Sequence, residues 1–238
     1  TFLGLWIFGW NRLPKRLPLA PPWLAVLGSI VSAFFIIAAN SWMQHPVGIE
    51  FIDGRPVLTD IFAVLSNNTA IAAYTHTIFG ALGVGGAFLL GIAWYQLWQR
   101  RKDNIDTVDA AGRVVVGENR TIPGRDKADH SVWITSLRWG AVVAIIGFAG
   151  VAITGDYQAK LMFEQQPMKM AAAEAACADG TGFSVLAFGD LAAQDCSQVT
   201  TVIEIPGLLS FLANGDFTTE VKGVNTLVPI YQDKYGTN

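Results

Sequence analysis

The stretch AAYTHTIFGALGVGGAFLLGIAWY, residues 72–95, decides the fold class of this chain. It contains no Asp, Glu, Lys or Arg, and it lies inside a longer apolar block that runs from Thr69 to Trp98. A helix needs about 20 predominantly apolar residues to cross the hydrocarbon core of a bilayer. Because backbone polar groups in lipid must bond to one another, a block of this composition forms a helix there. We therefore predict a transmembrane helix in this block.

Composition extends this prediction to the whole chain. Of its 238 residues, 52% are hydrophobic and 15% are charged, whereas soluble domains carry about a quarter charged residues. The mean hydropathy is +0.38. We predict an all-α integral membrane protein, a transmembrane helix bundle. Its predicted full spans lie at about residues 22–44, 69–98 and 131–154. Residues 1–10 form a half-span, because ten residues make about 15 Å of helix, and we expect the first half of this helix to precede Thr1.

Basic residues gather in alternate loops. Residues 11–21 hold three Lys and Arg, residues 45–68 hold one against three acidic residues, and residues 100–130 hold seven. Lys and Arg in short loops mark the cytoplasmic side. The first and third loops are therefore predicted to be cytoplasmic, and residues 155–238 to form an extracytoplasmic loop. No basic face carries interleaved aromatic residues, which argues against a nucleic-acid partner.

The predicted outer loop begins where the last span ends. Asp156 follows a glycine, a pattern typical of a helix stop at the interface. Residues 160–176 are rich in Met, Ala, Gln and Glu and predict a helix, with Pro167 near a helix start. Beyond them, Gly, Asp, Ser and Thr interrupt the pattern, and short β-branched runs such as residues 199–205 appear. We expect an ordered loop.

His76 is the most informative single residue, because ionisable side chains inside a span are uncommon and usually functional. Ala72, Gly80 and Gly83 share its helix face. This stripe of small residues is suited to the bare wall that a haem ligated by histidine needs. The alternative is a close helix–helix contact across which His76 hydrogen-bonds.

Four further residues are candidates for polar chemistry. Ser32 and Asn40 share one face of the first full span and suit either a hydrated proton path or interhelical hydrogen bonds.

Lys169 and Glu174 are five positions apart and do not match an i,i+4 ion pair. A carboxylate base and an ammonium donor are the groups that oxidation of a quinol requires. An ordinary solvated helix face is the alternative for this pair.

Two cysteines, Cys177 and Cys196, lie in the predicted outer loop. Disulfides persist on the oxidising side of a membrane. A disulfide between them would stabilise the fold by roughly 3 kcal/mol. The alternative is two unpaired, buried thiols.

Four segments resemble, in order, successive parts of cytochrome bd oxidase subunit I. They are GLWIFGWNRLPKRL at residues 4–17, SAFFIIAANSWMQHPVG at 32–48, the stretch at 72–95, and GDYQAKLMFEQQPMKMAAAE at 155–174. The resemblance covers residues 1–176, and beyond them only the position matches that of the family's quinol-binding loop. Members carry further spans before Thr1 and after Asn238, which implies that this chain is a fragment.

The resemblance implies roles for the candidate residues. His76 matches the axial ligand of the low-spin haem b, and Lys169 and Glu174 match a lysine and a glutamate associated with quinol binding and oxidation. Ser32 and Asn40 match positions assigned to a proton path. Where the family commonly has aspartate, this sequence has Asn11, which cannot relay protons by ionising.

The resemblance also implies cofactors, partners and location. A complete subunit would carry high-spin haems b and d, pair with a second large oxidase subunit and small accessory subunits, and lie in the bacterial plasma membrane. It would oxidise quinol at the outer face and pass electrons to haems that reduce oxygen to water. The fragment alone is expected to be inactive. The competing hypothesis is a transporter or channel subunit with His76 in a polar pathway.

Overall fold

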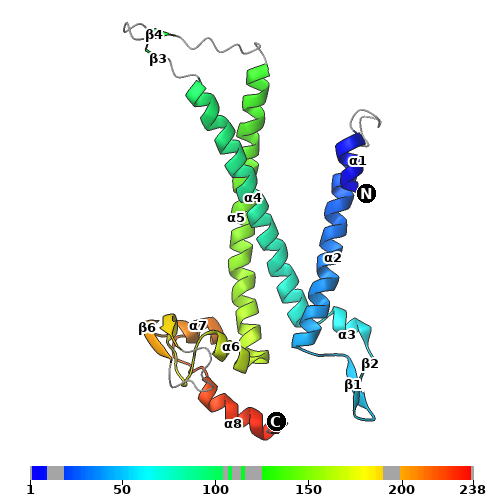
Figure 1. Ribbon diagram of the computed structural model, residues 1–238, viewed down its shortest axis with the longest axis vertical. Coiled ribbons are helices and arrows are strands. Elements are labelled where there is room, and N and C mark those ends of the chain that lie inside the picture. Colours follow the sequence, from blue (N-terminus) through cyan, green and yellow to red (C-terminus); the bar gives the residue numbers. More distant parts are fainter. Residues whose placement is uncertain are drawn as a thin grey trace. The chain divides into compact units, whose positions relative to one another are not determined.

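The computed structural model describes residues 2–9, 19–103, 107–108, 114–115, 125–189 and 199–236 (Figure 1). Two compact units make up the chain: residues 1–74 with 154–238, and residues 75–153. The elements are α1 (Phe2–Gly9), α2 (Ala20–Gln44), β1 (Ile49–Ile52), β2 (Arg55–Leu58), α3 (Ile61–Leu65), α4 (Asn68–Asp103), β3 (Thr107–Val108), β4 (Val114–Val115), α5 (Arg125–Gln165), α6 (Pro167–Ala173), β5 (Phe183–Phe188), β6 (Thr200–Ile205), α7 (Leu208–Asn214) and α8 (Val224–Tyr235).

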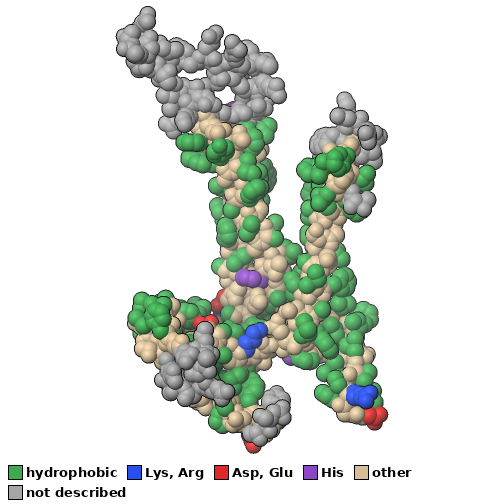
Figure 2. Space-filling view, viewed as in Figure 1, with side chains coloured by type: hydrophobic (Ala, Val, Ile, Leu, Met, Phe, Trp, Pro, Cys, Tyr) green, Lys and Arg blue, Asp and Glu red, His purple; other side chains and the backbone are tan. Residues whose placement is uncertain are grey.

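Three stretches of helix in the described part of the chain are long and apolar enough to cross a membrane. They are Ala20–Gln44, Ile61–Gln99 and His130–Gln165. Large apolar side chains face outward along them; Phe35 and Ile36 of α2 are 55% and 66% exposed. Figure 2 shows hydrophobic side chains over the visible faces of the long helices. Exposed apolar surface on this scale fits contact with lipid or other spans. The predicted class, a helical membrane protein, is confirmed.

The last long helix does not end at Asp156, and that prediction is wrong. α5 continues to Gln165, and Lys160 lies one turn beyond Asp156 with its Nζ 2.8 Å from Asp156 Oδ2. Such an i,i+4 ion pair supports continued helix. The break comes at Gln166, with φ −135° and ψ 56°, because a residue before proline is pushed out of the helical region. Pro167 then starts α6, as its position near a helix start predicted.

Short antiparallel strand pairs modify the all-α expectation in the loops. β1 and β2 form a hairpin whose turn residues, Asp53 and Gly54, both have positive φ, 52° and 75°. That geometry matches the twist of two adjoining strands. β5 pairs with β6, and β6 coincides with the β-branched run at 199–205. β3 pairs with β4 between α4 and α5.

Glycines bring α4 and α5 close together inside the unit of residues 75–153. A Cβ added to Gly86 would meet the backbone of Ala144, and one added to Gly140 would stand 2.8 Å from the backbone nitrogen of Leu90. Because lipid tails are as apolar as the side chains, spans associate through packing, and small residues permit the closest approach. These glycines therefore hold the two helices together.

Candidate functional site at the ends of α2, α5 and α6

The short helix α6 carries the two predicted quinol-site residues. Lys169 lies in its first turns and is exposed, whereas Glu174 caps its C-terminal end and is half-buried. The end is closed by the N–H of Ala175 bonding to Ala172 O at 3.3 Å and that of Ala176 to Ala171 O at 2.9 Å. Ala175 has φ 53°, the left-handed conformation that ends such a motif. The cap fixes where the Glu174 side chain leaves the backbone.

The Glu174 carboxyl differs from an ordinary surface carboxyl. Burial raises its pKa above the ordinary value. Desolvation disfavours the charged form of a carboxylic acid, so the group binds a proton more readily than an exposed glutamate does. A carboxylate with a raised pKa is a better proton acceptor near neutral pH.

Lys169 contacts the end of α2. Its Nζ donates to Gln44 Oε1 at 2.8 Å, and Gln44 Nε2 donates to Asn40 Oδ1 at 2.5 Å. A second bond joins the same elements, because Gln166 Nε2 donates to the backbone oxygen of Gln44 at 2.6 Å. The structure thus links two predicted residues, Lys169 and Asn40, through one that the sequence did not single out. The one signal for Gln44 was its place one turn after Asn40 at the end of a span.

Further amide side chains tie α2, α4 and α5 together near this point. Asn67 Nδ2 donates to His45 O at 3.0 Å, directly after α2. Gln165, the last residue of α5, accepts from Thr69 Oγ1 at 2.5 Å and donates to Asn68 Oδ1 at 2.9 Å. The two bonds of Gln165 join the end of α5 to the start of α4 within this unit.

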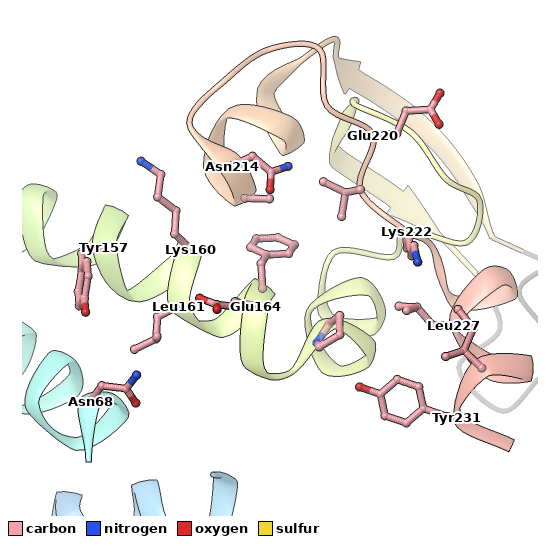
Figure 3. Close-up of a pocket in the computed structure, with 15 residues that line it drawn as sticks. Asn68, Tyr157, Lys160, Leu161, Glu164, Asn214, Glu220, Lys222, Leu227 and Tyr231 are labelled. Atoms are coloured by element: carbon pink, nitrogen blue, oxygen red, sulfur yellow. The ribbon is translucent and has the colours of Figure 1, made fainter. Parts of the chain in front are cut away.

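A cavity of about 890 Å³ lies beside α5, but neither Lys169 nor Glu174 lines it. Figure 3 shows Lys160 and Glu164 of α5 on one side and Lys222 and Tyr231 across from them. Its wall mixes apolar and charged groups, a composition that suits an amphipathic molecule. The sequence did not predict this cavity, because its walls come from α4, α5, α6, α7, α8 and the segment before α8.

His76 is half-buried on α4. Of the small residues expected to form a bare wall beside it, Gly83 is covered by α5, since a Cβ on it would stand 3.1 Å from the ring of Phe148, whereas a Cβ on Gly80 would be in ordinary contact with Val151 at 3.9 Å. These glycines serve the close helix–helix contact that was the alternative. The described residues contain no cluster of three His, Cys, Asp or Glu that could hold a metal. An imidazole on a half-buried helix position still fits one axial ligand of a haem iron.

The two predicted proton-path residues, Ser32 and Asn40, are not brought together. Ser32 is exposed on α2 and lines a groove of about 440 Å³ together with apolar side chains. Asn40 lies two turns further along α2 and accepts a hydrogen bond from Gln44. Cys177 is disulfide-bonded. Its predicted partner, Cys196, lies outside the described residues, as does Asn11.

Comparisons with known proteins agree with one another. The family model described as cytochrome bd terminal oxidase subunit I matches residues 1–235. The cytochrome bd ubiquinol oxidase subunit 1 of Bacillus subtilis (strain 168) is 33% identical over 236 residues, 99% of this chain and 44% of that protein. The cytochrome bd-II ubiquinol oxidase subunit 1 of Escherichia coli (strain K12) is 30% identical over 234 residues, 96% of this chain and 40% of that protein.

A solved structure shares the fold. The bd oxidase from Geobacillus thermodenitrificans matches with a TM-score of 0.64 and 25% sequence identity, over 94% of this chain and 45% of that chain. The chain spans less than half the length of these relatives.

Proposed function

Because the chain belongs to the cytochrome bd terminal oxidase subunit I family, we propose that it forms the quinol-oxidising, haem-binding part of a terminal oxidase that reduces oxygen to water. The curated relatives at 33% and 30% identity are named ubiquinol oxidases, which supports a quinol as the electron donor. The complete oxidase, with the spans and subunits beyond this chain, carries the full reaction.

The proposed quinol site uses the two ends of α6. Lys169 presents an ammonium held by a neutral amide, and Glu174 presents a carboxyl whose pKa is raised by burial. Lys169 donates a hydrogen bond to a quinol oxygen, and Glu174 accepts the proton from a hydroxyl. Oxidation of one quinol to a quinone releases two protons and two electrons, so a proton acceptor must stand beside the ring. The observation that carries the proposal is that Glu174, whose pKa is raised by burial, caps the short helix α6 on which Lys169 lies.

His76 is the residue of this chain that would hold a low-spin haem b through its imidazole. When bound, the haem would supply one-electron transfer. His76 contributes the imidazole from a helix position that is half-buried. High-spin haems b and d belong, in this proposal, to parts of the subunit outside this chain.

In this proposal the chain is part of a multi-pass protein of the bacterial plasma membrane. Its helix α6 and the segment after it lie on the outer side of that membrane. The distribution of Lys and Arg among the loops supports that side. Protons released at Glu174 then leave on the outer side. The proposed partners are membrane lipid, a second large oxidase subunit and small accessory subunits.

A reduced-minus-oxidised spectrum of the complete oxidase in membranes tests the proposal, with wild type beside His76→Ala. A low-spin haem b signal is expected in the wild type and should be lost in the variant. If the wild type shows no such signal, the oxidase proposal fails and the transporter hypothesis takes its place. A signal that persists in the variant moves the ligand to another residue.

A further inference from the structure

Gln44, the last residue of α2, contacts α6 and the residue before it at two points. Its side-chain Oε1 accepts from Lys169 Nζ at 2.8 Å, and its backbone oxygen accepts from Gln166 Nε2 at 2.6 Å. Hydrogen bonds to charged groups are stronger than those between neutral groups, so the first bond restrains an otherwise flexible lysine. We propose that Gln44 is a positioning residue for quinol oxidation, which holds the Lys169 ammonium in place for the quinol. This inference rests on the proposed function.

The amide of Gln44 has a defined orientation. Its Nε2 donates to Asn40 Oδ1 at 2.5 Å, one turn back on α2. The NH2 donor and the carbonyl acceptor of an amide lie in one plane and point in different directions, so a donor directed at Asn40 leaves the acceptor to face Lys169. Asn40 therefore acts as an anchor for Gln44, and the three side chains form one chain of hydrogen bonds that ends on the ammonium.

A neutral partner suits a lysine that must bind a substrate oxygen. A carboxylate in place of the amide would pair with the ammonium and compete with the quinol for it. Gln44 Oε1 instead occupies one of three N–H donors and leaves the positive charge in place. Within the described residues Lys169 has no ion pair. Because the side chain is already ordered, quinol binding has less conformational entropy to remove.

The test measures steady-state oxidation of a short-chain ubiquinol by the complete oxidase carrying Gln44→Leu, Lys169→Ala or both. Loss of one hydrogen bond to a charged group should raise KM roughly fivefold in Gln44→Leu, with a smaller change in kcat. The double variant should be no worse than Lys169→Ala, because Gln44 acts through that lysine. Haem spectra of each variant show whether the oxidase has assembled.

Gln44→Glu is the second variant, since its protonated form keeps the shape, the acceptor oxygen for Lys169 and a donor for Asn40, whereas its carboxylate loses that donor. Its carboxylate should raise KM as it deprotonates, and this pH dependence should be absent in Gln44→Leu. A merely structural role of Gln44 predicts no such difference. Gln165→Leu is the matched control: Gln165 bonds Thr69 and Asn68 near the same helix ends and makes no contact with Lys169, so KM should stay unchanged.

The two proposals fail in different ways. If Lys169→Ala leaves KM for the quinol unchanged, the proposed quinol site is wrong. If Lys169→Ala raises KM while Gln44→Leu does not, the positioning role alone is wrong. Additive losses in the double variant, or a Gln44→Glu variant whose KM does not change with pH, would also overturn the positioning role.

Discussion

The aromatic ring of Phe148, on α5, covers Gly83 of α4 at 3.1 Å from where a Cβ on that glycine would stand. The ring takes the space that a side chain would need. Along the same pair of helices, Gly86 faces the backbone of Ala144. Since contact between spans in lipid depends on packing, this close approach is what joins α4 to α5. The small residues that follow His76 along α4 thus serve a helix–helix contact.

Gly86→Ala should separate α4 from α5 and destabilise the protein by about 1 to 3 kcal/mol, because the added methyl meets backbone that cannot move aside. Gly85→Ala is the control, since a Cβ there has nothing within 4 Å. Thermal unfolding of the detergent-solubilised oxidase, followed by haem absorbance, compares the two. Equal midpoints for both variants would show that the contact is not tight.

Glu174→Gln should lower kcat for quinol oxidation on the order of a hundredfold, because the amide cannot accept the proton. The low-spin haem spectrum should be nearly normal, since Glu174 is not a ligand. Glu50→Gln, on the exposed strand β1, is the control and should leave kcat unchanged. Loss of the haem signal in Glu174→Gln would contradict the role of this residue.

Stability should depend on pH through Glu174. Burial raises its pKa above the ordinary value of 4.5, so the folded protein keeps the proton to higher pH than the unfolded chain does. Unfolding then releases a proton between the two pKa values, and the free energy of unfolding falls as pH rises through that window. Thermal midpoints of wild type and Glu174→Gln should diverge with rising pH, the wild type being the less stable. Parallel midpoints would mean that this carboxyl is not desolvated.

Asp216→Asn should loosen the turn after α7. The Asp216 carboxylate accepts the N–H groups of Thr219 and Thr218 at 2.7 and 2.8 Å, and these bonds hold its pKa well below the ordinary range. The stability it contributes is present above the ordinary pKa and is lost only as pH falls through the lowered one. Hydrogen exchange at the amides of Thr218 and Thr219 should accelerate in the variant. Asp233→Asn, on the exposed face of α8, should change neither amide.

Cys177→Ser tests the predicted disulfide. Cys177 is disulfide-bonded, and the chain contains two cysteines. Alkylation of the denatured, unreduced wild-type protein should therefore label no cysteine, whereas the variant should label Cys196. Loss of the bond should cost roughly 3 kcal/mol in the chain-entropy model. Labelling of the wild type would exclude the pairing.

Residues close together in the chain were sufficient to predict the membrane-spanning helices. A helix that crosses a bilayer needs a minimum number of apolar residues, and whether a segment has them can be read from that segment alone, as at Thr69 to Trp98. The start of α6 at Pro167 and the strand β6 likewise follow from local conformational preferences. The prediction that the helix ends at Asp156 is wrong because a glycine followed by an acid is a weak local stop signal. The helix α5 continues until the residue before a proline leaves the helical conformation.

Tertiary structure alone decided how the candidate site is assembled. Gln44 and Lys169 lie 125 positions apart, and no pattern in either segment indicates that the amide of one meets the ammonium of the other. Glutamine also carries no chemical signature of its own, unlike a histidine inside a span. Only the packing of α2 against the region of α6 brings those groups within hydrogen-bonding distance, and only the packing of α4 on α5 shows what covers Gly83. Local sequence determines which segments are helices, whereas contacts between distant side chains depend on how those helices pack.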